Sequence, residues 1–91
     1  MSAALLIDKK AIELIKEYMK KENAPAVRVF IAGGGCCKRT EIAAVKKALA
    51  GDVSYERDGI KIFVENGLAE NSSAIDIKFE EQKGLIIEFQ K

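Results

Sequence analysis

The segment Gly33-Gly34-Gly35-Cys36-Cys37 combines the residue types and the spacing that are best suited to chemistry in this chain. Consecutive glycines adopt backbone angles closed to other residues and leave no side chains beside the next residue, which can therefore enter a tight space. Lys38 and Arg39 follow, and neighbouring cations favour the thiolate, the form of cysteine that attacks electrophiles and binds soft metals. The segment is predicted to be a reactive thiol site.

A plainer interpretation of the same segment stays open. The glycines can form a simple bulge, and free cysteines often pack as small buried hydrophobes. Lys38 and Arg39 suit a phosphate or an acidic partner, but a pair of cations is more often just solvated.

The composition fits one domain that covers residues 1–91. Apolar residues make up 48% of the chain and charged residues 32%, a balance that buries a core and keeps a solvated surface. The 15 basic and 14 acidic residues are interspersed and leave a net charge of +1, so nucleic acid is not an expected partner.

The start of the chain and its cysteines favour the cytoplasm. The apolar run Ala3-Ala4-Leu5-Leu6-Ile7 stops at Asp8, far short of a signal-peptide core or of the roughly 20 apolar residues of a membrane span. The two cysteines are neighbours and cannot form the disulfide framework of a secreted protein. Because the chain has no His, imidazole ligation and a His base are excluded within one protomer.

One helix and one strand are expected before the glycines. Apolar residues recur at helical spacing over residues 9–22, and Asp8 is placed to cap the first turn. The period changes to two from residue 26, where Val27, Val29 and Ile31 point the same way. The strand therefore leads directly into the glycine segment.

Two further pairs of strands are expected after the cysteines. Asp58-Gly59 between alternating apolar runs predicts a hairpin over residues 53–64, and residues 74–79 and 85–89 are a second hairpin or two neighbouring strands. Residues 39–50 fit either a helix or an edge strand. The residues alone predict an N-terminal helix packed on a mostly antiparallel sheet.

Four pieces of the chain carry a resemblance to a known family: the helix 7–15, the strand 27–31, the turn 32–36 and the stretch 51–64. In their order and spacing they resemble the HesB/IscA-like family of iron–sulfur cluster biogenesis proteins, over nearly the whole chain from Leu6 to Phe89. The resemblance implies an α+β, mostly β fold, a β-sandwich-like arrangement of mixed and antiparallel strands with the N-terminal amphipathic helix packed on it. It also favours a strand over a helix for residues 40–47.

The resemblance implies a carrier rather than an enzyme. Such a protein binds iron or a [2Fe-2S] or [4Fe-4S] cluster and exchanges it with client apoproteins or a cluster scaffold, commonly as a homodimer or a larger oligomer. Cys36 matches the first cysteine of the family. The usual members carry two more cysteines in a C-terminal Cys-Gly-Cys segment, whereas this chain has none after Cys37 and resembles a shorter HesB-like branch with a doubled cysteine.

The number of thiols makes a second chain necessary for a cluster. Cluster iron takes four thiolates or substitutes, and one chain supplies at most Cys36 and Cys37. A cluster is therefore expected to bridge two protomers at a dimer interface. Zinc accepts the same sulfur ligands, so the sequence does not separate iron from zinc.

Two other functions remain open from the sequence. Cys36 and Cys37 could cycle between a dithiol and a strained vicinal disulfide, or trap a soft metal, although the Cys-x-x-Cys spacing of disulfide oxidoreductases is absent. The chain could also be a cofactor-free interaction module that keeps the family fold. Tyr18 and Tyr55 are expected to pack in the core or across strands, with no catalytic role.

Overall fold

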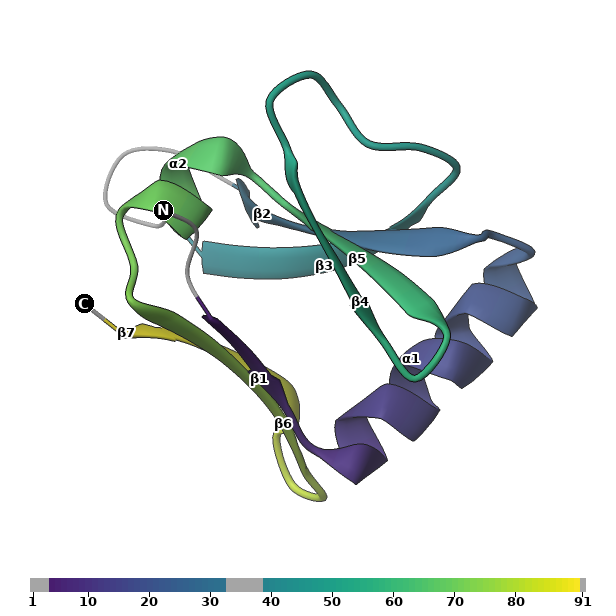
Figure 1. Cartoon of the computed structure of the whole chain (residues 1–91). Coiled ribbons are helices and arrows are strands. Elements are labelled where there is room, and N and C mark those ends of the chain that lie inside the picture. Colours follow the sequence, from purple (N-terminus) through teal and green to yellow (C-terminus); the bar gives the residue numbers. More distant parts are fainter. Residues whose placement is uncertain (1–3, 33–38, 91) are drawn as a thin grey trace.

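Two β-sheets and a long helix enclose the apolar core in the computed structural model, which describes residues 4–32 and 39–90 (Figure 1). The three-stranded sheet has the order β1-β6-β7, and the four-stranded sheet has the order β3-β2-β5-β4. The elements are β1 (Ala4–Ile7), α1 (Lys9–Glu22), β2 (Ala26–Ala32), β3 (Arg39–Val45), β4 (Val53–Arg57), β5 (Ile60–Val64), α2 (Asn66–Glu70), β6 (Ala74–Glu80) and β7 (Gly84–Gln90).

Helix α1 begins and ends where the sequence predicts. The Asp8 carboxylate accepts the backbone N–H of Ala11 at 2.7 Å, which satisfies a donor that the first helical turn leaves unpaired. At the other end Asn23 adopts a left-handed conformation with φ 53°, and its N–H donates to the carbonyl of Lys20. The helix buries Ala11, Ile12 and Ile15 against the sheets.

Strand β2 lies inside the four-stranded sheet and carries the predicted alternation. Val27 and Val29 are fully buried, while the alternate residues Arg28 and Phe30 are only half-buried. The strand pairs antiparallel with β3 and parallel with β5. β3 confirms the strand that the resemblance favoured for residues 40–47, although it begins at Arg39 and ends at Val45. Its backbone groups complete the ladder of β2.

Both predicted hairpins are present. β4 and β5 are joined by Asp58 and Gly59, whose φ angles of 49° and 83° match the left-handed two-residue turn that Asp-Gly favours. β6 and β7 pair antiparallel from Ala74 opposite Gln90 to Glu80 opposite Gly84. Tyr18 and Tyr55 pack against the core as expected.

Two elements were not predicted from the sequence, and the strands form two sheets where one was predicted. β1 pairs in parallel with β6, about 70 positions along the chain, and α2 is a five-residue helix after β5. The residues alone predicted one sheet, whereas the structure has two, as a β-sandwich-like fold requires. A four-residue strand whose partner is so distant leaves no local signal, because only the pairing itself distinguishes it from an apolar loop.

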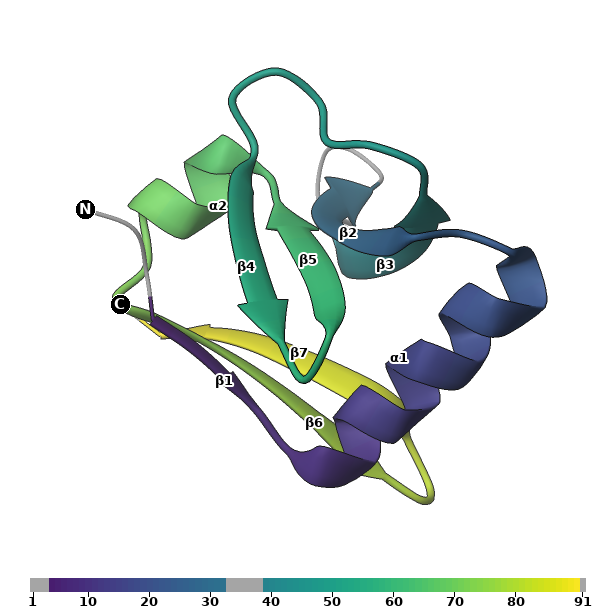
Figure 2. The ribbon, with the colours of Figure 1, turned by 45° about the vertical axis from the view of Figure 1, so that its right-hand side comes forward.

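The connection between β3 and β4 is held by an ion pair on the outer face of the four-stranded sheet. Arg28 donates to both carboxylate oxygens of Asp52, at 2.8 and 3.1 Å, and the Asp52 side chain is only 2% exposed. The same carboxylate accepts the backbone N–H of Leu49 at 3.0 Å. In Figures 1 and 2 this connection arches away from the sheets, so the ion pair fixes the base of a projecting loop.

Replacing Asp8 with Ala is expected to lower the free energy of unfolding by about 1–3 kcal/mol. The variant loses the cap on Ala11 and a second hydrogen bond, from the backbone N–H of Phe79 to the other carboxylate oxygen at 3.2 Å. Asp8→Asn keeps one acceptor oxygen and should lose less. Urea denaturation followed by circular dichroism measures the difference, and an unchanged midpoint in Asp8→Ala would contradict the assignment.

The ion pair predicts a pH dependence of stability. The hydrogen bond from Arg28 holds the pKa of Asp52 below its ordinary value, and the Leu49 N–H adds to this against the opposing effect of burial. Because the folded-state pKa is depressed, the stabilisation is complete above about pH 4 and is lost as the pH falls through the folded pKa.

Asp52→Asn is therefore expected to cost about 2–3 kcal/mol at neutral pH and less in acid. Urea denaturation of both proteins between pH 7 and pH 2 gives the difference in unfolding free energy at each pH. A difference that stays constant below pH 4 would show that the carboxylate charge of Asp52 does not stabilise the fold.

Candidate functional site

The predicted site residues Gly33, Gly34, Gly35, Cys36 and Cys37 lie outside the described residues. The structure does place the two strand ends from which they continue. Ala32 ends β2 and Arg39 begins β3, and the two residues are Cα partners in the antiparallel ladder. Both thiols therefore belong to a segment that starts and finishes at the same end of the four-stranded sheet.

Glu65 ties this end of β2 to the rest of the fold. The parallel pairing of β2 with β5 stops at Val29 and Val64, where the chain turns into α2. The N–H of Glu65 still donates to the carbonyl of Val29 at 3.1 Å, and its carboxylate accepts the N–H of Ile31 at 3.2 Å. The Glu65 carboxylate thus takes the place of the next backbone hydrogen bond that β5 would offer to β2, two residues before the first glycine.

The position of Glu65 explains why its side chain is available for β2. It is the N-cap residue of α2, yet within the described chain its carboxylate makes no hydrogen bond to the helix. Sequence analysis did not identify this residue. The available signal was an acidic residue directly after the apolar strand Ile60–Val64, which by itself is too common to single out.

A shallow hollow lies beside this strand end. Its volume is about 340 Å³, and it is lined by Ile31, Glu65, Gly67, Leu68 and Asn71. Ile31 is 39% exposed, one of the few large apolar side chains that the described surface leaves open. The hollow therefore combines an apolar side chain with a carboxylate and an amide next to the predicted thiol segment.

The described residues offer no alternative metal centre. Among residues 4–32 and 39–90 no three His, Cys, Asp or Glu side chains gather closely enough to hold a metal ion. The thiols of the sequence are Cys36 and Cys37, which fall between these ranges, and Met19 supplies a thioether sulfur among the described residues. Thiolates are the ligands that thiophilic metals prefer, so the predicted segment 33–37 holds the donors best suited to such a metal.

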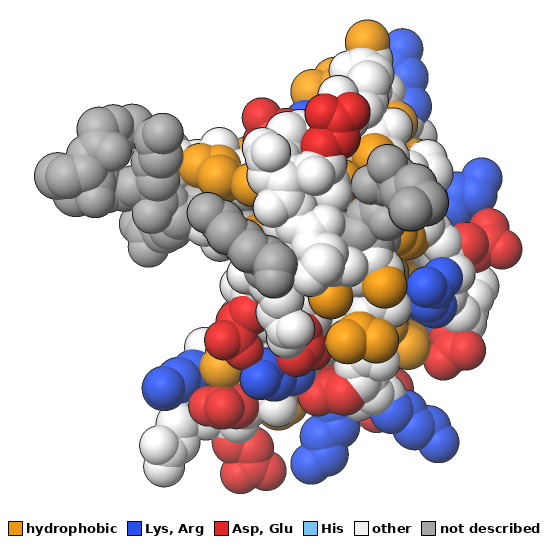
Figure 3. All heavy atoms as spheres, turned by 60° about the vertical axis from the view of Figure 1, so that its left-hand side comes forward, with side chains coloured by type: hydrophobic (Ala, Val, Ile, Leu, Met, Phe, Trp, Pro, Cys, Tyr) orange, Lys and Arg blue, Asp and Glu red, His pale blue; other side chains and the backbone are white. Residues whose placement is uncertain are grey.

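Charges of both signs are mixed on one face of the molecule (Figure 3). Figure 3 shows one face of the molecule, on which acidic and basic side chains lie among one another without a block of one sign. Burial raises the pKa of the Tyr55 phenol, against an opposing effect of the Arg57 charge. No helix in the described part of the chain is long and apolar enough to cross a lipid bilayer.

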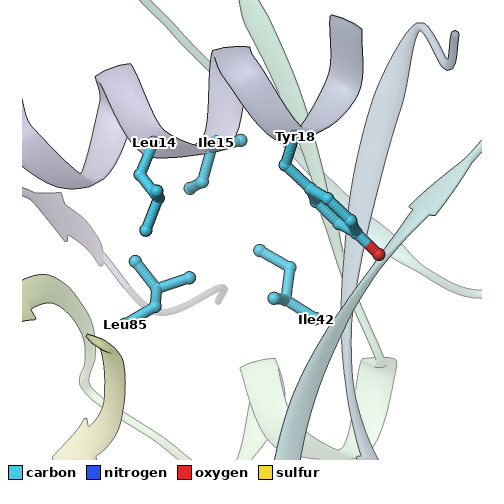
Figure 4. Close-up of a pocket in the computed structure, with 5 residues that line it drawn as sticks. All are labelled: Leu14, Ile15, Tyr18, Ile42 and Leu85. Carbon is cyan, nitrogen blue, oxygen red and sulfur yellow. The ribbon is translucent and has the colours of Figure 1, made fainter. Parts of the chain in front are cut away.

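An apolar groove lies between α1 and two edge strands, on a part of the molecule that sequence analysis did not select. Its apolar end has a volume of about 290 Å³, and the side chains that line it face one another in Figure 4. They are Leu14, Ile15 and Tyr18 of α1, Ile42 of β3 and Leu85 of β7. β3 and β7 each end the strand order of their sheet, so the groove marks an open side of the sandwich.

A second hollow adjoins the groove at Leu14 and is called the acidic end of the groove below. Leu14 also lines a second hollow, together with Lys10, Glu13, Glu17, Phe79 and Glu81. Three carboxylates therefore stand against one ammonium group beside the apolar end. Glu13 and Glu17 are one helical turn apart on α1, a spacing that the sequence contains but that also suits a solvated helix face.

Three solved structures are similar to this chain over almost its whole length. The crystal structure of Escherichia coli SufA, which is involved in biosynthesis of iron–sulfur clusters, matches with a TM-score of 0.70 and 22% identity, covering 99% of this chain and 82% of SufA. A crystal structure of IscA with the [2Fe-2S] cluster gives 0.66 and 17%, covering 96% and 84%. The solution structure of an Aquifex aeolicus protein gives 0.71 and 20%, covering 97% and 93%.

At these identities the likeness shows the fold. The chain has the HesB/IscA-like fold that the resemblance implied, mostly β with mixed sheets and an N-terminal helix. No family model matches the sequence, and no curated protein matches it either.

Replacing Glu65 with Ala is expected to speed amide hydrogen exchange at Ile31 on the order of tenfold, since a hydrogen bond to a charged acceptor is worth about 1.5 kcal/mol or more. Glu65→Gln keeps an acceptor oxygen and should stay close to the native rate. NMR exchange measurements compare the Ile31 amide with that of Val29 in the same samples. Equal rates at Ile31 in the native and Ala proteins would mean that this carboxylate does not hold the end of β2.

Proposed function

We propose that this protein binds iron or an iron–sulfur cluster through Cys36, with Cys37 as the second candidate ligand, and passes this cargo to client apoproteins or a cluster scaffold. The observation that carries the proposal is a Gly-Gly-Gly-Cys-Cys segment that joins β2 to β3 in a chain with the HesB/IscA-like fold. Among the similar structures, SufA is involved in biosynthesis of iron–sulfur clusters and IscA is seen with a [2Fe-2S] cluster.

The donor chemistry supports a site shared by two chains. Each chain brings two thiols and no imidazole, while a cluster takes four thiolates or substitutes. In this proposal Cys36 and Cys37 of two protomers together hold the cargo, and the protein is a homodimer or a larger oligomer. The cargo is a [2Fe-2S] or a [4Fe-4S] cluster or single iron ions, and zinc competes for the same sulfurs.

We also propose that the protein works in the cytoplasm, as a carrier and not as an enzyme. Vicinal thiols stay reduced and able to bind metal in a reducing compartment. A cluster carrier needs its ligands near the surface, where a client can approach, and the strand ends next to the cysteines include the exposed Ile31.

A thiol redox or soft-metal-trapping function is the second candidate. It is favoured by one observation, that Cys36 and Cys37 are adjacent and need no further ligand from the described residues to form a vicinal disulfide or to bind mercury or arsenic.

Anaerobic reconstitution with iron and sulfide tests the carrier function. The native protein should bind iron and sulfide and develop the visible absorbance of a thiolate-ligated cluster, and Cys36→Ser should lose at least nine-tenths of both. Cys37→Ser should lose them as well if the pair acts together, and should keep them if Cys36 suffices. Bound iron and sulfide are measured chemically after removal of free ions.

The controls separate the two candidates. Glu65→Gln, which keeps an acceptor for Ile31, should reconstitute like the native protein. A native protein without bound iron or visible absorbance would reject the carrier function. Mass spectrometry after air oxidation then tests the dithiol function, because a vicinal disulfide lowers the mass by two hydrogens without linking chains.

A further inference from the structure

Leu49 is exposed on a loop whose backbone is fixed. Its side chain is 58% exposed, the largest exposure among the big apolar residues described. Its N–H donates to the Asp52 carboxylate, and its carbonyl accepts the N–H of Asp52 at 3.1 Å. Arg28 in turn clamps that carboxylate from β2. An apolar side chain on a pinned backbone loses little conformational freedom on binding, which is the property of an interface anchor.

Two lysines precede this leucine. Lys46 and Lys47 follow the last residue of β3 and are exposed, and neither forms an ion pair within the described residues. The segment 46–49, called the anchor segment below, thus presents two positive charges beside one apolar side chain. It lies on the loop that arches away from the sheets in Figures 1 and 2.

The groove beside α1 has the complementary properties. Its apolar end is lined by carbon-rich side chains, and its volume of about 290 Å³ accommodates an apolar side chain. Its acidic end carries Glu13, Glu17 and Glu81. Because Leu14 lines both ends, an apolar residue and neighbouring cations can occupy them together.

We propose that the groove beside α1 binds the anchor segment of a second copy of this chain. Leu49 of one copy occupies the apolar end between Leu14 and Ile42 of the other, and Lys46 and Lys47 face the carboxylates of the acidic end. The apolar contact supplies the affinity, and the opposite charges set the register. The second copy is favoured over another protein because both complementary surfaces occur on the same chain.

In this proposal the contacts are reciprocal: each copy inserts its anchor segment into the groove of the other, which gives a two-fold dimer. In the sequence the cysteines precede β3 and the anchor segment follows it, and Ile42 of the groove lies between these two ends of the strand. β3 runs from Arg39, next to the cysteines, to Val45, next to the anchor segment, and seven extended residues span roughly 20 Å. The contact uses no residue of the segment 33–38, so in this proposal a cluster shared between thiols would join such dimers into a larger assembly.

The test measures association in the Cys36→Ser/Cys37→Ser background, where neither a disulfide nor a cluster links chains. Sedimentation velocity of this full-length chain should show a reversible dimer. Leu49→Glu should weaken the dimer at least tenfold, whereas Leu6→Glu, which alters a side chain of similar 52% exposure on β1, should not. A monomeric parent, or an equal effect of the two substitutions, would overturn the proposal.

Charge reversal tests the register and guards against misfolding of a single variant. Lys46→Glu/Lys47→Glu and Glu13→Lys/Glu17→Lys should each be monomeric, and an equimolar mixture of the two should recover the dimer, because opposite charges then meet at both contacts. Circular dichroism confirms that each variant is folded. A mixture that stays monomeric while both parts are folded would overturn the proposal, and the result does not depend on iron binding.

Discussion

The fold depends on the position of β2 between an antiparallel and a parallel neighbour. Val27 and Val29 give the four-stranded sheet its fully buried centre, and Arg28 between them points outward to hold Asp52. The parallel partner leaves at Val64, so the last part of β2 has a strand on one side only and a carboxylate, Glu65, on the other. One strand thus links the core, the projecting loop and the end that carries the thiols.

Much of this arrangement follows from local sequence. Helix α1, β2 and both hairpins are confirmed, because helical spacing, alternation and Asp-Gly turns act over a few residues. β1 and the division into two sheets are not local: Leu5 becomes a core residue only by pairing with Ile75, far along the chain. The resemblance to a family supplied the sandwich and favoured a strand over residues 40–47, where the residues alone left the structure undecided and β3 is found at Arg39–Val45.

Part of the candidate site was also predictable from the sequence and part was not. Cys36 and Cys37 are conspicuous in the sequence because thiol chemistry belongs to the residue type itself. Glu65 and the groove became visible only in three dimensions, since a carboxylate that replaces a strand bond and a cleft between two sheets are properties of the packing. Among the described residues the packing brings no three His, Cys, Asp or Glu side chains close enough together to hold a metal ion.

The open side of the sandwich also bears on how this chain associates. With a net charge of +1, copies repel one another little, so an uncovered apolar groove and an exposed Leu49 would favour indiscriminate contacts. Charges next to the groove and next to Leu49 make such contacts more selective. In the proposed dimer, the carboxylates beside the groove repel an acidic or misaligned partner and attract Lys46 and Lys47. In the proposed dimer, pairing of the two surfaces removes both from water at one contact that uses no residue of the segment 33–38.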